Sequence, residues 1–186
     1  MKFAVVYTSV SGFTKRYAEW IAEDLGADIF PLRDFRRKMI RGYDVLIFGG
    51  SLHAVGINGI AFVRKNLDAL QGKNVLVFAT GASPDKPGIK EEIIQNNFPG
   101  NQAEGISFFY LRGGFDYSGL NPVNKILMSL LKMKIKCKPE HKRNADEVGM
   151  LKAFQKPADF TDRDAIRELV RAAENGDRGK IPEAPK

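Results

Sequence analysis

The chain of 186 residues contains little cysteine and histidine and no long apolar run, and each shortage excludes a class of protein. One cysteine, Cys137, excludes an internal disulfide and favours a reducing, cytoplasmic compartment. Two histidines and one cysteine are too few for a conventional zinc site, so we expect no bound metal. No apolar run approaches the roughly 20 residues of a membrane span, and Lys2 leads directly into a short strand-like stretch. We therefore expect neither a membrane span nor a signal peptide.

Two common phosphate-binding signatures are also missing. The chain has no G-x-x-x-x-G-K-[ST] motif and no G-x-G-x-x-G motif, which argues against a P-loop and a dinucleotide fingerprint. Its 44% apolar and 27% charged residues are typical of a globular protein. We expect one domain over residues 1–175, followed by a flexible polar tail over 176–186.

A hydroxyl-rich loop separates the first predicted strand from the first predicted helix. Four hydroxyls and one glycine fall within residues 8–14, directly after the apolar run 2–7. Hydroxyl donors, free backbone N–H groups and the positive end of a helix dipole suit a phosphate dianion. We expect Thr14 at the start of the helix. The sequence predicts a phosphate site formed by Thr8, Ser9, Ser11, Gly12, Phe13 and Thr14.

The spacing [ST]-x-[ST]-G-x-T after a first strand resembles the FMN phosphate loop of flavodoxins. The matching residues here are Ser9, Ser11, Gly12 and Thr14. The resemblance covers most of residues 1–175 and implies an FMN-binding redox protein that transfers electrons to a partner protein or a quinone. It also implies an α/β, flavodoxin-like three-layer sandwich. The alternative is an ordinary Ser/Thr-rich turn without a ligand.

Apolar runs that alternate with helical patterns predict an open parallel sheet covered by helices on both faces. With five strands and the phosphate loop at the first turn, we expect the strand order 2-1-3-4-5. The loops 8–14, 51–59 and 80–88 then meet at the carboxyl ends of the strands. We expect strands over 2–7, 28–32, 44–50, 74–79 and 106–111, and helices over 14–25, 34–41, 61–70, 89–97 and 162–174.

The loops after the third and fourth strands are candidates to hold the flavin ring. Each could instead be a simple connection, and His53 could stack on the ring, donate to it or lie at the surface. The sequence singles out no catalytic residue. The predicted ring contacts are Ser51, Leu52, His53 and Ala54 on one side and Thr80, Gly81, Ala82 and Ser83 on the other.

Three departures distinguish the chain from typical flavodoxins. The loop after the fourth strand has no Trp or Tyr to stack on a flavin, and Phe13 stands where flavodoxins often have asparagine. The net charge is +7, whereas flavodoxins usually have an acidic surface. These departures favour a second hypothesis, a binding module that kept the fold and lost the flavin.

The positive charge is concentrated in one segment. Residues 121–143 contain seven basic residues and one acidic residue, while the rest of the chain is nearly balanced, with 22 basic and 21 acidic residues. A local basic patch indicates an anionic partner. An apolar stripe crosses the same segment at helical spacing and consists of Val123, Ile126, Leu127, Leu130 and Leu131.

Three interpretations of this basic amphipathic helix remain open at the sequence level. The stripe packs on the domain core, or it docks on an anionic membrane surface or a partner, or the segment binds nucleic acid. Nucleic acid is the least favoured, since few aromatic residues alternate with the basic ones.

A narrower resemblance concerns the insert over residues 112–143. A flavodoxin-like chain with a long, basic, Met/Leu-rich segment after strand five is similar to the quinone-dependent protoporphyrinogen oxidase family. The similar stretches are residues 110–117 and 125–134. This resemblance implies a menaquinone-dependent oxidase attached to the membrane periphery, in which Arg112 and the basic insert attract substrate carboxylates.

Overall fold

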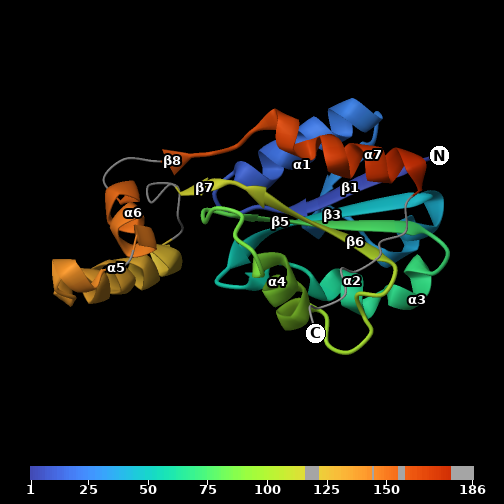
Figure 1. Cartoon of the computed structure of the whole chain (residues 1–186). Coiled ribbons are helices and arrows are strands. Elements are labelled where there is room, and N and C mark those ends of the chain that lie inside the picture. The colour runs from blue at the N-terminus through green and yellow to red at the C-terminus, as the bar shows by residue number, and fades with distance from the viewer. Residues whose placement is uncertain (116–121, 144, 155–157, 177–186) are drawn as a thin grey trace.

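The computed structural model describes residues 1–115, 122–143, 145–154 and 158–176. Its centre is a parallel sheet in the order β2-β1-β3-β5-β6 (Figure 1). Counted along the chain, these five parallel strands have the predicted order 2-1-3-4-5, which confirms the flavodoxin-like α/β architecture. The strands are β1 (Phe3–Thr8), β2 (Asp28–Pro31), β3 (Val45–His53), β5 (Asn74–Gly81) and β6 (Ile106–Arg112).

Helices cover both faces of the sheet and form the outer layers of a three-layer sandwich (Figure 1). On one face, Tyr17 and Ile21 of α1 pack with Leu169 of α7 against side chains such as Ile47 and Leu76. On the other face, side chains from the remaining helices pack against the alternate strand positions. The helices are α1 (Phe13–Leu25), α2 (Ala61–Lys65), α3 (Leu67–Leu70), α4 (Ile89–Asn97) and α7 (Arg167–Asn175).

Several predicted helices differ in detail from the observed ones. The segment predicted as a helix over 34–41 contains two 3-10 turns, Leu32–Asp34 and Arg37–Gly42. The helix predicted over 61–70 is interrupted at Asn66, whose side-chain amide donates to the Phe62 carbonyl oxygen at 2.6 Å. The last predicted helix begins as a 3-10 turn, Arg163–Ile166, and continues as α7.

The segment 51–59 was expected to be a loop, and this prediction is wrong for residues 51–53 and 56–57. Strand β3 continues to His53 and pairs antiparallel with β4 (Gly56–Ile57). Ala54 lies at the turn with a φ of 53°, which is the left-handed region. The result is a short hairpin that projects beyond the parallel sheet at its carboxyl end.

An insert between β6 and α7 stands beside this end of the sheet (Figure 1). Its neck is a two-stranded ribbon in which β7 (Gly114–Phe115) pairs with β8 (Ala158–Asp159). Beyond the neck lie α5 (Pro122–Cys137), a 3-10 turn (Glu140–Lys142) and α6 (Ala145–Ala153). Helix α5 was expected from the sequence, whereas α6 and the ribbon were not.

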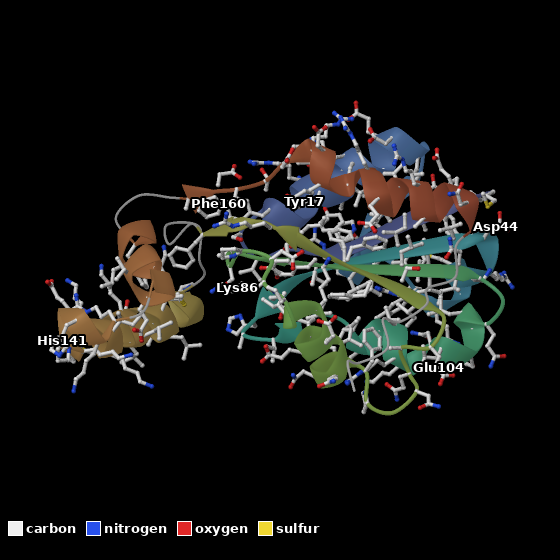
Figure 2. The ribbon with its side chains drawn as sticks, in the orientation of Figure 1. Tyr17, Asp44, Lys86, Glu104, His141 and Phe160 are labelled. Carbon is white, nitrogen blue, oxygen red and sulfur yellow. The ribbon has the colours of Figure 1, made fainter. Side chains whose placement is uncertain are left out.

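Tyr17 fixes both strands of this neck to the domain. Its hydroxyl donates to the Arg112 carbonyl oxygen at 2.8 Å and accepts from the Asp162 N–H at 3.0 Å. Figure 2 shows Tyr17 between the helical layer and the sheet, Phe160 at the neck and His141 at the outer end of the insert. The insert is therefore anchored at its base, while its helices extend away from the sheet.

Two predictions fall partly outside the described residues. The predicted tail over 176–186 is described only at Gly176, and residues 116–121 of the predicted insert are not described. Within the described ranges, no helix combines the length and the apolar character needed to cross a membrane.

Candidate functional site

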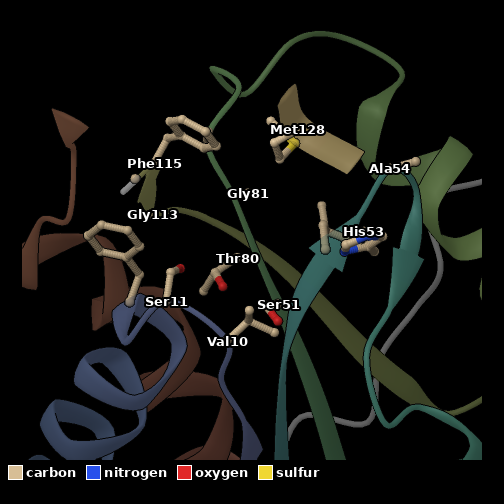
Figure 3. A pocket seen from close by; sticks show the side chains of 14 residues that line it. Val10, Ser11, Ser51, His53, Ala54, Thr80, Gly81, Gly113, Phe115 and Met128 are labelled. Atoms are coloured by element: carbon tan, nitrogen blue, oxygen red, sulfur yellow. The ribbon is translucent and has the colours of Figure 1, made fainter. Parts of the chain in front are cut away.

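The three loops that were expected to meet do so at the carboxyl ends of β1, β3 and β5. They surround a pocket of about 220 Å³, which the insert completes on one side (Figure 3). Nine of the fourteen predicted site residues line it. They are Ser11, Phe13, Ser51, Leu52, His53, Ala54, Thr80, Gly81 and Ala82.

The loop after β1 lies between this pocket and a second hollow. Thr8, Ser9 and Gly12 line that hollow together with Lys15 and Arg33. The predicted hydroxyls therefore do not all face one point, since Ser11 lines the first pocket and Thr8 and Ser9 line the second. Sequence spacing identified the loop but not the direction of each side chain.

The loop ends at the N-terminus of α1. Gly12 is the residue before the helix and has a φ of 90°, a conformation that side chains rarely tolerate. The Gly12 N–H donates to the Ser9 hydroxyl oxygen at 3.1 Å. The next N–H groups, those of Phe13, Thr14 and Lys15, belong to the first helical turn and have no acceptor within the helix. They give this end of the pocket a partial positive charge.

Thr14 has a different position from the one predicted. The helix begins at Phe13, and Thr14 lies inside its first turn with only 1% of its surface exposed. Its hydroxyl shares a hydrogen bond of 2.6 Å with the hydroxyl of Thr80, which is also buried. This pair joins the start of α1 to the end of β5 beneath the pocket.

The Thr14–Thr80 pair yields a test by double-mutant cycle. We expect Thr80→Val to lower the free energy of unfolding by about 1–2 kcal/mol, because the Thr14 hydroxyl would be left buried without a partner. The double variant Thr14→Val, Thr80→Val should lose no more free energy of unfolding than Thr80→Val alone, since neither buried hydroxyl of the pair remains. Urea unfolding of Thr14→Val, Thr80→Val and the double variant measures the three losses, and a double loss equal to the sum of the two single losses would show that the two hydroxyls are not coupled.

Asn58 is a site residue that the sequence analysis missed. Its carbonyl oxygen accepts from the Thr8 hydroxyl at 2.8 Å, and its side-chain amide donates to the Ser51 hydroxyl at 2.9 Å. Its backbone N–H donates to the Ser51 carbonyl oxygen at 3.0 Å. Asn58 therefore holds the loop after β1 and the hairpin after β3 in fixed positions. An asparagine in a predicted loop gave no signal of this role.

Tyr110 fixes the loop after β5 in a similar way. Its hydroxyl donates to the Ser83 carbonyl oxygen at 2.7 Å, so Ser83 supports the pocket wall without lining it. Burial is the main reason why the pKa of Tyr110 is raised to about 12, so this hydroxyl stays a donor to a higher pH than that of an exposed tyrosine. Gly81 must lack a side chain, because a Cβ there would lie 2.6 Å from the Tyr110 hydroxyl oxygen.

The insert provides one aromatic and one sulfur-containing side chain of the pocket. Phe115 of β7 and Met128 of α5 line it opposite the β3–β4 hairpin (Figure 3). Phe115 packs edge-on against Phe154 of α6, with ring centroids 5.3 Å apart. The loop after β5 has no Trp or Tyr, but Phe13 and Phe115 place two aromatic rings at the pocket. The sequence analysis had not assigned Phe115 or Met128 to the site.

His53 is exposed, and Arg112 makes contacts that join two parts of the fold. His53 is exposed on the hairpin, where it lines the rim of the pocket. The Arg112 guanidinium lies 3.7 Å from the centre of the Phe160 ring and donates through Nε to the Ala82 carbonyl oxygen at 3.3 Å. Arg112 thus ties the neck of the insert to the pocket wall.

Three solved structures to which this chain is similar are each below 25% identical to it. The flavodoxin, WrbA-like protein from Agrobacterium tumefaciens is 24% identical over 52% of this chain and 68% of its own, with a TM-score of 0.42. The two-electron reduced flavodoxin of Megasphaera elsdenii is 16% identical over 58% and 82%, with a TM-score of 0.44. A Lactobacillus acidophilus flavoprotein in complex with FMN is 17% identical over 60% and 91%, with a TM-score of 0.38.

Comparison with curated proteins finds no match to this sequence. Comparison with family models finds one that covers most of the chain. The model described as a flavodoxin domain matches residues 4–143, a range that includes the loop after β1, the hairpin after β3, the loop after β5 and helix α5. The chain therefore belongs to the flavodoxin domain family.

Proposed function

We propose that the protein binds FMN in this pocket and transfers electrons to a redox partner, either a protein or a quinone. The observation that carries the proposal is the combination of a helix N-terminus with a largely apolar slot at the carboxyl ends of β1, β3 and β5. In an open α/β sheet, ligands bind at this edge. An FMN molecule has a phosphate for the helix end and a flat ring, apolar at its dimethylbenzene end, for the slot.

The residues present fit such a cofactor. The Ser11 hydroxyl and the N–H groups of the first turn of α1 would hold the phosphate. The hairpin residues Ser51–Ala54 and the β5 end, Thr80–Ala82, would flank the ring, with Phe115 at its edge. When bound, FMN supplies one- or two-electron chemistry, and the protein supplies orientation, partial exclusion of water and a polar environment.

The first test is the visible spectrum of the purified protein before and after FMN is added. We expect either a yellow protein or a colourless one that binds FMN with a shift of the flavin bands and a change in flavin fluorescence. A colourless protein that leaves the spectrum and fluorescence of FMN unchanged would contradict the proposal. That result would favour the alternative of a flavin-free binding module on the same fold.

A second candidate is a quinone-dependent oxidase that resembles the protoporphyrinogen oxidases. The observation that favours it is Met128, which brings the insert helix α5 to the wall of the pocket, where a second substrate would meet the ring. The Arg112 guanidinium is less favourable, because it is already engaged with Phe160 and Ala82. Flavin-dependent oxidation of protoporphyrinogen with a menaquinone analogue is the test, and FMN-loaded protein without turnover favours the electron carrier.

A further inference from the structure

Helix α5 has two apolar faces, and among the described residues one of them is buried while the other is exposed. On the inner face, Ile135 is 4% exposed and Met128 lines the pocket. On the outer face, Ile126, Leu130 and Met133 are 63%, 54% and 58% exposed. The outer residues are spaced i, i+4 and i+7, so they form one stripe along the helix.

This exposure decides between the interpretations of the apolar stripe that the sequence left open. Ile126, Leu127 and Leu130 do not pack on the domain core, because more than half of each side chain is exposed. Four of the large apolar side chains exposed in the described part of the chain gather on this single helix. Clustered exposure of this kind marks an interaction surface, whereas isolated exposed apolar residues are ordinary.

The charges around the stripe identify the chemistry of the partner. Lys134 follows Leu130 by four residues and Lys136 follows Met133 by three, so both exposed lysines flank the outer face. Residues 122–137 contain no aspartate or glutamate. A second copy that met this helix through its own α5 would place lysines against lysines without a carboxylate on either helix, so a symmetric α5-to-α5 dimer is disfavoured.

We propose that the outer face of α5 docks on the surface of an anionic lipid bilayer. The apolar stripe lies at the boundary between headgroups and acyl chains, and the flanking lysines face the anionic headgroups. The helix lies along the membrane surface. Because Met128 and the outer stripe project from the same helix, the pocket lies about one helix diameter, roughly 10 Å, from the bilayer.

The chain carries a built-in reporter for this test. Cys137, the only cysteine, is exposed and follows Met133 by four residues, so it extends the outer stripe. A polarity-sensitive fluorophore attached to Cys137 should shift its emission to the blue when full-length protein meets vesicles of mixed phosphatidylglycerol and phosphatidylcholine. Unlabelled protein should float with the same vesicles. Pure phosphatidylcholine vesicles should bind it much more weakly, and added salt should reduce binding to the anionic vesicles.

Variants separate the apolar contribution from the electrostatic one. The triple variant Ile126→Gln, Leu130→Gln, Met133→Gln keeps good helix formers and should lower the vesicle partition coefficient at least about tenfold. The pair Lys134→Gln, Lys136→Gln should lower it by about tenfold. The matched control, Lys38→Gln, Arg41→Gln, removes the same charge from another exposed basic cluster and should leave binding unchanged.

Three results would overturn the proposal. In the first, the wild-type protein does not float with anionic vesicles. In the second, the triple glutamine variant binds these vesicles as well as wild type. In the third, the control variant Lys38→Gln, Arg41→Gln loses as much binding as the variant Lys134→Gln, Lys136→Gln. The first would point to an acidic protein as the partner, and the last to a general charge effect. Circular dichroism establishes that each variant is folded, and none of these measurements depends on bound FMN.

Discussion

Replacing Ser11 by aspartate is expected to weaken FMN binding by at least about a hundredfold, which corresponds to roughly 2.7 kcal/mol. The Ser11 side chain lines the pocket beside the N-terminus of α1, where the phosphate dianion is proposed to bind. A carboxylate there would repel the phosphate. Two unit charges about 4 Å apart interact by roughly 4 kcal/mol at the effective dielectric constant of a protein surface, and salt reduces this only in part.

Ser11→Asp should not destabilise the ligand-free protein and could even stabilise it. A carboxylate just before α1 can accept from the free N–H groups of the first turn and interacts favourably with the helix dipole. The unfolding temperature of the ligand-free variant should therefore stay level or rise while its FMN affinity falls. This opposition separates a loss of binding from a loss of folding.

Two controls complete this test, which fluorescence titration can follow. Ser11→Thr keeps the hydroxyl and should bind FMN nearly as well as wild type. Riboflavin has the same ring and no phosphate, so Ser11→Asp should affect riboflavin binding far less than FMN binding. Equal losses for FMN and riboflavin would place the phosphate away from Ser11 and would favour the hollow lined by Thr8, Ser9 and Lys15.

The parallel sheet could be predicted from the sequence because its signals are local. Buried strands such as β3 and β5 are continuous apolar runs, and glycine follows the first helix at Gly26, which has a φ of 59°. The strand ends were less predictable. Strand β3 continues through Gly49, Gly50 and Ser51 into a hairpin, because its neighbours β1 and β5 and the strand β4 supply hydrogen-bonding partners along that length.

The candidate site was predictable only as a set of loops. The sequence located the turns after β1, β3 and β5, because their order along the chain brings them to one edge of the sheet. It did not reveal Asn58, Tyr110, Phe115 or Met128, whose roles depend on contacts with residues distant in the chain. Nor did it reveal that the Thr14 hydroxyl pairs with the hydroxyl of Thr80, which lies 66 residues away. Spacing predicts which backbone segments meet, whereas packing decides which side chains face the pocket.

The second large effect is expected at Gly49, in the centre of the sheet. A Cβ atom at this position would lie 2.1 Å from Cζ of the Phe78 ring, far inside van der Waals contact. Phe78 is fully buried and lies opposite Gly49 in the register of β3 and β5. We expect Gly49→Ala to lower the free energy of unfolding by about 3 kcal/mol, because neither the ring nor the central strand can move without disturbing close-packed neighbours. The unfolding temperature should fall by roughly 6–12 °C.

Gly42→Ala is the matched control for this substitution. A Cβ atom at Gly42 would meet no other atom within 4 Å, and the same change there should alter stability by no more than about 0.5 kcal/mol. A second variant isolates the clash itself. If the Phe78 ring is the obstacle, Gly49→Ala should cost much less in a Phe78→Leu background than in wild type, since the shorter side chain leaves room for the added methyl group. Equal costs in the two backgrounds would show that the strand, and not the ring, excludes a side chain at Gly49.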